Sequence, residues 1–236
     1  MKRTGLLLLI MFTSLLSPCG AQESGEQASP WAIGLRGGWT STTISRYDGG
    51  RMDEAYSALG GFEAGIQGRY TVNPWLALRA NLSFMQRNHR MDRNLNYLDP
   101  VYTKHRNDYL VLPVMADFSF GGEVVRGHLL AGGYAGYWLN DHRKGTTYWM
   151  TDYYVYFEDF EDTREFTDED QRLTAGVVFG AGLSYSIDSR WELGLDALYY
   201  YDLTSHHRGY DNVADPRYLN TLSLTFNIHY KHMSKG

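Results

Sequence analysis

Apolar and polar residues alternate with a period of two along most of the chain from residue 31 onward. Such alternation predicts β-strands that have one apolar and one polar face. Eight segments can be delimited in this way, namely residues 31–39, 62–72, 76–85, 109–120, 127–139, 173–185, 191–201 and 218–230. Residues 127–139 are so rich in glycine and alanine that the sequence does not assign their faces. The last three segments have about ten residues or more, which is long enough to cross a bilayer as tilted strands.

The connections between these segments differ in length in an ordered way. Short turns are expected at residues 73–74, 121–123 and 188–189, and long loops at residues 45–57, 88–107, 140–170 and 204–217. Outer-membrane barrels have short turns in the periplasm and long loops outside the cell. The sequence therefore predicts an all-β fold, an eight-stranded antiparallel up-and-down transmembrane β-barrel with long extracellular loops.

A soluble eight-stranded barrel is the alternative, because it shows the same alternation with the apolar face turned inward. The composition of the polar faces favours the membrane barrel, since they contain arginine and acidic residues but almost no lysine. The lysines beyond the N-terminus fall in predicted loops or the tail, and they are Lys104, Lys144, Lys231 and Lys235. Aromatic residues also cluster near the strand ends, as in the interfacial girdles of membrane barrels, and the final segment ends on Phe226, Ile228 and Tyr230.

The N-terminus has the features of a secretory signal peptide. Lys2 and Arg3 precede a short apolar run, and cleavage is expected after Ala21. A lipidated N-terminus at Cys19 is the alternative. The predicted organisation is a signal peptide at 1–21, a short polar leader at 22–30, the barrel at 31–231 and a C-terminal tail at 232–236. The expected location is the bacterial outer membrane, reached by export.

Cysteine content and charge exclude several classes of function. Cys19 is the only cysteine, so the mature chain would have no disulfide framework, cysteine nucleophile or thiolate metal site. The formal net charge of −5 argues against nucleic acid as a partner.

Five short motifs resemble the PorT-like outer-membrane β-barrel proteins of Bacteroidetes. They are GLRGG at 34–38, GFEAG at 61–65, NPW at 73–75, YLVLP at 109–113 and GAGLSY at 180–185. The resemblance extends over roughly residues 31–231 and implies eight strands and the outer membrane. The family's named member serves a protein-secretion system, but most relatives have no assigned role, and the motifs mark structure rather than activity. The long third loop of this chain departs from the usual pattern.

The polar faces place charged side chains inside the predicted barrel. They are Arg36, Glu63, Arg69, Arg79, Asp117, Arg172, Glu192 and Asp196. Because an eight-stranded interior is only wide enough for its own side chains, we expect a plug rather than a charged conduit. Most of these charges are expected in one layer in the periplasmic half, where arginine–carboxylate pairs would satisfy them. Asp196 is expected within reach of Arg36.

The long loop at 140–170 is the strongest signal that the strand pattern does not explain. Its aromatic residues form a candidate recognition surface for a protein or a glycan, and they are Tyr148, Trp149, Tyr153, Tyr154, Tyr156 and Phe157. The acidic residues that follow could bind a divalent cation, but no spacing matches a calcium loop. The competing interpretation is a hairpin that extends the fifth and sixth strands, with aromatics for packing and acids for solubility.

No convincing catalytic or metal-binding set is evident. Ser205 and His206 near Asp202 would suit a hydrolase, but neither a nucleophile elbow nor an oxyanion loop accompanies them. The histidines of the predicted loops are interpreted as solvated rather than as metal ligands, and they are His89, His105, His142, His206 and His207. We therefore expect no enzymatic activity, cofactor or metal.

The leading hypothesis is a structural or interaction protein, embedded in outer-membrane lipid, that presents extracellular loops to a protein or glycan partner. The alternatives are an accessory component of a secretion or transport system and a membrane-embedded hydrolase.

Overall fold

The computed structural model describes residues 27–46, 54–93, 101–152, 154–167, 170–205 and 217–234, which form one ten-stranded sheet. The strands are β1 (Gln27–Arg46), β2 (Glu54–Asn73), β3 (Leu76–Gln86), β4 (His89–Arg93), β5 (Val101–Gly121), β6 (Val125–Met150), β7 (Val155–Thr163), β8 (Leu173–Ser186), β9 (Trp191–Asp202) and β10 (Arg217–Ser234). Within these residues, no helix has the length and apolar character needed to cross a membrane.

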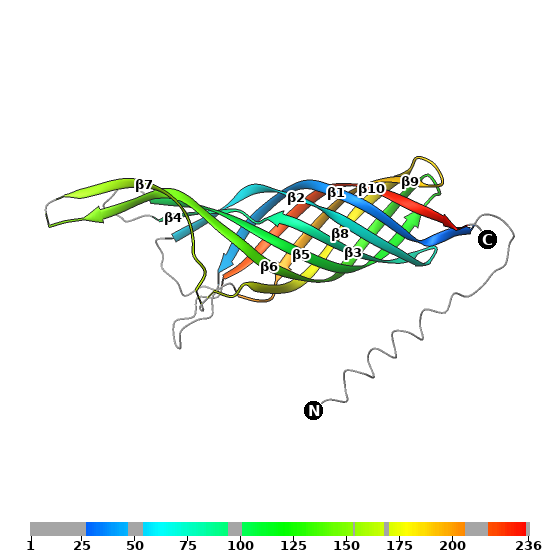
Figure 1. Cartoon of the computed structure of the whole chain (residues 1–236), viewed down its shortest axis with the longest axis horizontal. Helices are drawn as coiled ribbons and strands as arrows, with labels where there is room; N and C mark the ends of the chain where they lie inside the picture. The colour runs from blue at the N-terminus through cyan, green and yellow to red at the C-terminus, as the bar shows by residue number, and fades with distance from the viewer. Residues whose placement is uncertain are drawn as a thin grey trace, which may run out of the picture.

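Eight of the strands close into a ring in the order β1–β2–β3–β5–β6–β8–β9–β10 (Figure 1). The ring is closed by pairing of the first strand with the last, which places Ile33 opposite Tyr230 and Trp39 opposite Leu224. All neighbouring strands are antiparallel. The other two strands lie beyond one end of the ring, where β4 pairs with β2 and β5, and β7 pairs with β6. The predicted eight-stranded antiparallel barrel is confirmed.

The two faces of the wall are arranged in the opposite way to those of a soluble barrel. On β10, Phe226 is 72% exposed, whereas its neighbours Thr225 and Asn227 are 0% and 4% exposed. Large apolar side chains cover the outside of the ring, among them Leu35, Ile66, Leu112, Phe179 and Leu195. An apolar exterior this extensive suits a bilayer and not water. The alternation also holds on β6, where Leu129 and Tyr137 point outward, whereas His128 and Trp138 point inward.

The short turns lie together at one end of the barrel, near the beginning of β1 and the end of β10 (Figure 1). Side chains stabilise two of these turns. The Asn73 side-chain oxygen accepts hydrogen bonds from the backbone of Trp75 and Leu76, and Asp188 accepts from Arg190 and Trp191. In the third turn, Gly121 has a positive φ of 115°, a conformation that favours glycine.

The opposite end differs from the sequence prediction. Two of the predicted loops are largely strand, because β4 and the start of β5 lie within 88–107, and the end of β6 and all of β7 lie within 140–170. Threonine and aromatic residues in these stretches favour strands. The strand β1 also begins at Gln27, inside the expected leader, and β10 continues to Ser234, inside the expected tail. Residues 47–53 and 206–216 of the other two predicted loops lie outside the described residues.

Candidate functional site

The lumen contains a chain of ion pairs near the end with the short turns. Arg69 on β2 contacts Glu192 at 2.9 Å and Asp117 at 3.6 Å. Arg79 on β3 contacts Asp117 at 2.5 Å and Asp196 at 2.7 Å. Arg69 and Arg79 are direct cross-strand neighbours, and like charges in such positions repel. The carboxylate of Asp117 between them removes this repulsion.

The ion pairs of Arg69 and Arg79 form a charge layer near the short turns, and other groups complete this layer. Lys231 contacts Glu192 at 2.7 Å, so three cations balance three carboxylates. The position of Lys231 corrects its assignment to the tail. Asn227 donates a hydrogen bond to Asp196 at 2.8 Å, which leaves the layer both neutral and cross-linked. Arginine–carboxylate hydrogen bonds of this kind satisfy charges that would be costly to bury alone.

Arg36 and Glu63 form a separate ion pair in the lumen, farther from the short turns. Their atoms lie 3.1 Å apart, and both side chains are fully buried. Ser223 donates to Glu63 at 2.5 Å, and Arg36 donates to Thr225 at 3.1 Å. Asp196 was expected within reach of Arg36, but the ion pairs join Arg36 to Glu63 and Asp196 to Arg79. The stagger of the tilted strands places Asp196 level with Arg79 instead.

Arg172 is the one expected inward charge that the structure places elsewhere. Its guanidinium carbon lies 4.4 Å from the ring centre of Phe166 and 4.6 Å from that of Tyr137, which is 39% exposed. The guanidinium also donates to the backbone oxygen of Trp138 at 3.1 Å. Arg172 comes just before β8, where the strand alternation that would direct it inward has not yet begun.

Sequence reasoning missed a second charged cluster in the lumen. Arg87 follows β3 and is fully buried, and it contacts Asp202 of β9 at 2.7 Å. Its guanidinium carbon lies 5.4 Å from the centre of the Tyr109 ring, and Tyr134 donates a hydrogen bond to Asp202. The signal was present in the sequence. Arg87 continues the inward odd-numbered face of its segment, and Asp202 continues the inward even-numbered face of residues 191–201.

A relay of hydrogen bonds joins Asp117, His128 and Ser184. The His128 Nδ1 atom lies 2.8 Å from Asp117, and its Nε2 atom lies 2.8 Å from the Ser184 hydroxyl. This order matches that of a serine-hydrolase triad, but Asp117 is shared with two arginines. Ser184 lies within paired strands, with Arg126 and Gly194 opposite it. The local backbone N–H groups are engaged in the sheet instead of forming an oxyanion site, so we interpret the relay as part of the lumen filling.

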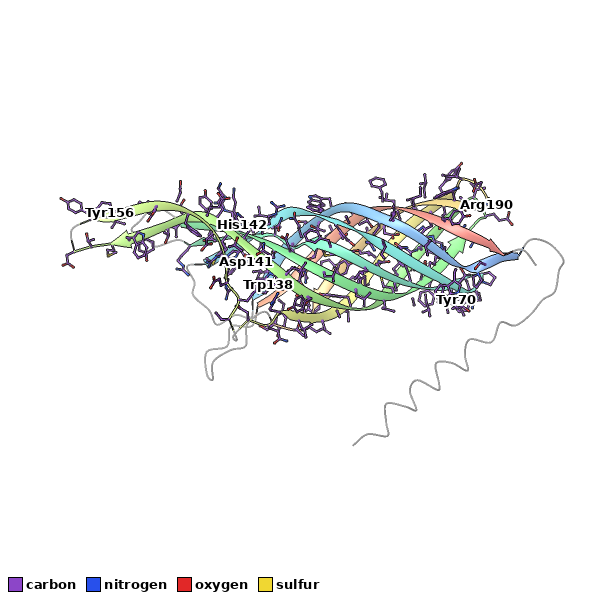
Figure 2. The ribbon with its side chains drawn as sticks, in the orientation of Figure 1. Tyr70, Trp138, Asp141, His142, Tyr156 and Arg190 are labelled. Carbon is purple, nitrogen blue, oxygen red and sulfur yellow. The ribbon has the colours of Figure 1, made fainter. Side chains whose placement is uncertain are left out.

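The candidate recognition loop is a two-stranded ribbon formed by β6 and β7. Figure 2 shows Tyr156 at the far end of this ribbon, remote from Tyr70 and Arg190 at the opposite end of the molecule. Most of the predicted recognition residues are exposed, namely Trp149 at 63%, Tyr154 at 66%, Tyr156 at 55% and Phe157 at 43%. Tyr148 is half-buried, and Tyr153 lies outside the described residues.

The aromatic side chains occupy both faces of the ribbon. Trp149 pairs with Tyr156 across the strands, and Tyr148 pairs with Phe157. Cross-strand partners share a face and successive pairs alternate, so each face has one aromatic pair near the tip.

The acidic residues of β7 pair across the same ribbon. Arg143 contacts Asp162 at 2.7 Å, and Lys144 contacts Glu161 at 2.8 Å. The hydrogen bond and charge of Lys144 lower the pKa of Glu161, and Glu161 in turn raises the pKa of Lys144. These contacts support a structural role for the acids. The described residues include no group of three or more histidine, cysteine or acidic side chains that could hold a metal ion.

The loop histidines lie in different places. His89 and His105 stack at the junction of barrel and ribbon, with ring centres 4.6 Å apart, and His105 lies 3.2 Å from Asp141. They line a small cavity of about 80 Å³. His142 contacts Glu161 on the ribbon at 3.1 Å. His206 and His207 lie outside the described residues, and His206 is the histidine of the hydrolase alternative.

The closed ring, its apolar exterior and its charge-filled lumen define an outer-membrane β-barrel. Residues 21–208 match the model of the outer membrane protein beta-barrel domain, and the chain belongs to this family. The protein is therefore located in the bacterial outer membrane.

Solved structures show the same fold. The outer membrane protein OprG from Pseudomonas aeruginosa is 10% identical, with a TM-score of 0.52 over 89% of this chain and 99% of that one. The outer membrane protein AlkL is 13% identical, with a TM-score of 0.50 over 93% and 98%. No curated protein matches the sequence. At these identities the likeness concerns the fold alone.

Proposed function

We propose that the barrel is a membrane anchor that holds the β6–β7 ribbon outside the cell for a protein or glycan partner. The observation that carries this proposal is the exposure of aromatic side chains at the end of the ribbon, far from the short turns (Figure 2). Trp149, Tyr154 and Tyr156 are each more than half exposed. Several large aromatic side chains exposed together on a water-facing surface are typical of a binding site.

The interior supports an anchor in preference to a pore or an enzyme. Ion pairs join strands across the lumen at two levels, through Arg79 and Asp196 and through Arg87 and Asp202. Buried apolar side chains also fill the interior, among them Met115, Leu130, Leu198 and Tyr200. We infer that no continuous aqueous path runs through it and that the protein has no catalytic role.

A place in a secretion system is the second candidate. It is supported by the motifs that resemble PorT-like barrels, including residues 61–65 and 109–113. This role is compatible with an anchor, because an accessory component also acts by holding a partner at the membrane.

Site-specific photo-crosslinking in intact cells tests the proposed function. A photoreactive amino acid replaces Tyr156 at the ribbon, and a matched variant carries it at Arg190 in the turn at the opposite end. We expect covalent adducts with an extracellular protein or glycan from the Tyr156 position only. Adducts from neither position, in a correctly inserted barrel, would contradict the proposal.

A further inference from the structure

The outer edge of β7 is an open strand edge. Among the described residues, β7 pairs with β6 alone and is the last strand of the sheet. An unpaired edge presents the N–H and C=O groups of every second residue, so the stretch Val155–Thr163 has about four residues ready to pair with a further strand. Such an edge is a template for strand addition by an extended peptide.

The charge of this edge is only partly compensated. The acids of β7 are Glu158, Asp159, Glu161 and Asp162. Glu161 and Asp162 pair with Lys144 and Arg143. Glu158 and Asp159 are instead held by neutral donors, the indole N–H of Trp149 at 3.0 Å and the hydroxyl of Thr146 at 2.7 Å. Within the part of the chain that the structure describes, these two carboxylates have no ion pair, so two negative charges remain for a neighbouring strand.

We propose that the β7 edge binds a basic, extended segment of a partner protein by strand addition, with its lysine or arginine side chains beside Glu158 and Asp159. Side chains on a newly paired strand lie about 5 Å from those of the edge strand on the same face, which is close enough for ion pairs. Nearer the tip, Tyr156 and Phe157 provide apolar contacts for the same segment. This inference rests on the proposed function, because it specifies the partner of the same ribbon.

A second copy of this chain fits the edge poorly. Antiparallel pairing of two β7 strands about Phe160 places Glu158 opposite Asp162 and Asp159 opposite Glu161, so the acidic stretch lies against itself. Like charges in cross-strand positions are destabilising, and charged edges protect native sheets from self-association. The acids thus disfavour self-pairing and favour a basic partner.

A synthetic peptide tests the proposal with the full-length protein in lipid nanodiscs. The probe Thr-Lys-Lys-Val-Lys-Lys-Tyr-Tyr-Val places lysines opposite the four acids and tyrosines opposite the aromatics when it lies antiparallel to β7. Two isomers are methylated on alternate backbone nitrogens, one on each edge of the peptide, and therefore have the same charge and composition. Fluorescence anisotropy measures the dissociation constant of each.

Strand addition predicts that only one methylated isomer loses binding, because only one edge donates hydrogen bonds to β7. The double variant Glu158→Gln, Asp159→Asn should bind the unmodified probe roughly tenfold more weakly, the size expected for two lost cross-strand charge pairs. Asp152→Asn, which removes one negative charge in the ribbon turn, is the control and should leave binding unchanged. The heat-dependent gel mobility of each variant verifies that the barrel is folded.

Several results would overturn the inference. Equal binding of both methylated isomers would show a purely electrostatic contact. Flotation with phosphatidylcholine vesicles in the absence of peptide binding would show that the tip inserts into lipid instead. Self-association detected by mass photometry would assign the edge to a second copy. If Tyr156 crosslinks to an extracellular partner but no peptide binds, the proposed function stands and the strand-addition inference fails.

Discussion

Arg79 of β3 and Asp196 of β9 form an ion pair of 2.7 Å between strands that occupy opposite positions in the eight-stranded ring. The side chains therefore meet across the full width of the lumen. Their neighbour Asp117 contacts the same guanidinium at 2.5 Å, so one arginine joins three parts of the wall. This bridge is the reason to regard the interior as a structural element of the barrel.

Removing the bridge should destabilise the barrel. Arg79→Ala leaves Asp117 and Asp196 with fewer cationic partners in a closed interior, and breaking such a buried pair costs about 3–5 kcal/mol. Urea unfolding in detergent micelles, followed by tryptophan fluorescence, measures the free energy of unfolding. Lys144→Ala is the control, because the Lys144 side chain is 64% exposed and exposed pairs contribute little. Equal losses in the two variants would contradict the lumenal bridge.

The lipid-facing surface provides a second prediction. Leu195 points outward from within β9, and Leu203 points outward just beyond the end of the same strand. Leu195→Arg should cost about 2–4 kcal/mol near the bilayer midplane, whereas Leu203→Arg should cost about 0–1 kcal/mol near the interface. Unfolding in lipid vesicles measures both variants. A similar cost at both positions would mean that the outer face is not in lipid as described.

The sequence alone predicts much of this barrel for a simple physical reason. Alternation with a period of two fixes which side chains face outward, as Phe226 and Asn227 show, and the short turns fix the order of the strands. Sequence does not fix which charges meet across the lumen. The partner of Asp196 depends on strand stagger, which is a property of the closed ring and not of any one segment.

The ends of the predicted segments differ from the ends of the strands. The segment predicted from the alternation ends at Met85 and omits Arg87, which lies on the same inward face. The stretch 140–170 contains the hairpin given as the competing interpretation, formed by the end of β6 and by β7. The ion pairs of Arg143 and Lys144 with acids on the facing strand show how the ribbon accommodates its acidic residues.

The ribbon should respond to acid through Glu161. The hydrogen bond from Lys144 lowers the pKa of Glu161, so the folded ribbon favours the ionised carboxylate. The resulting stability is present above the ordinary glutamate pKa and is lost as the pH falls through the lowered pKa. NMR titration of the Glu161 carboxyl carbon should show the lowered pKa, and Lys144→Met should return it toward the ordinary value. An unchanged pKa in that variant would contradict the pairing.

Shortening the ribbon should separate folding from binding. Deleting residues 146–159 removes the tip but keeps the pairing of Thr103 with Gly145 and all strands of the ring. We expect the shortened protein to insert and to keep heat-dependent gel mobility, but to lose the adducts with extracellular partners. Asp162 is kept in the shortened protein. A photoreactive amino acid at this position in the full-length and in the shortened protein measures the adducts of each. Failure of the shortened chain to assemble would assign the tip a structural role.

Ion conductance in planar lipid bilayers tests most directly the claim that the lumen is filled and that the protein acts through its extracellular ribbon. The purified protein, inserted and verified by gel mobility, should produce no stepwise current, because ion pairs such as those of Arg79 with Asp196 and Arg87 with Asp202 cross the lumen at two levels. Reproducible single-channel steps from the unmodified protein would contradict the account.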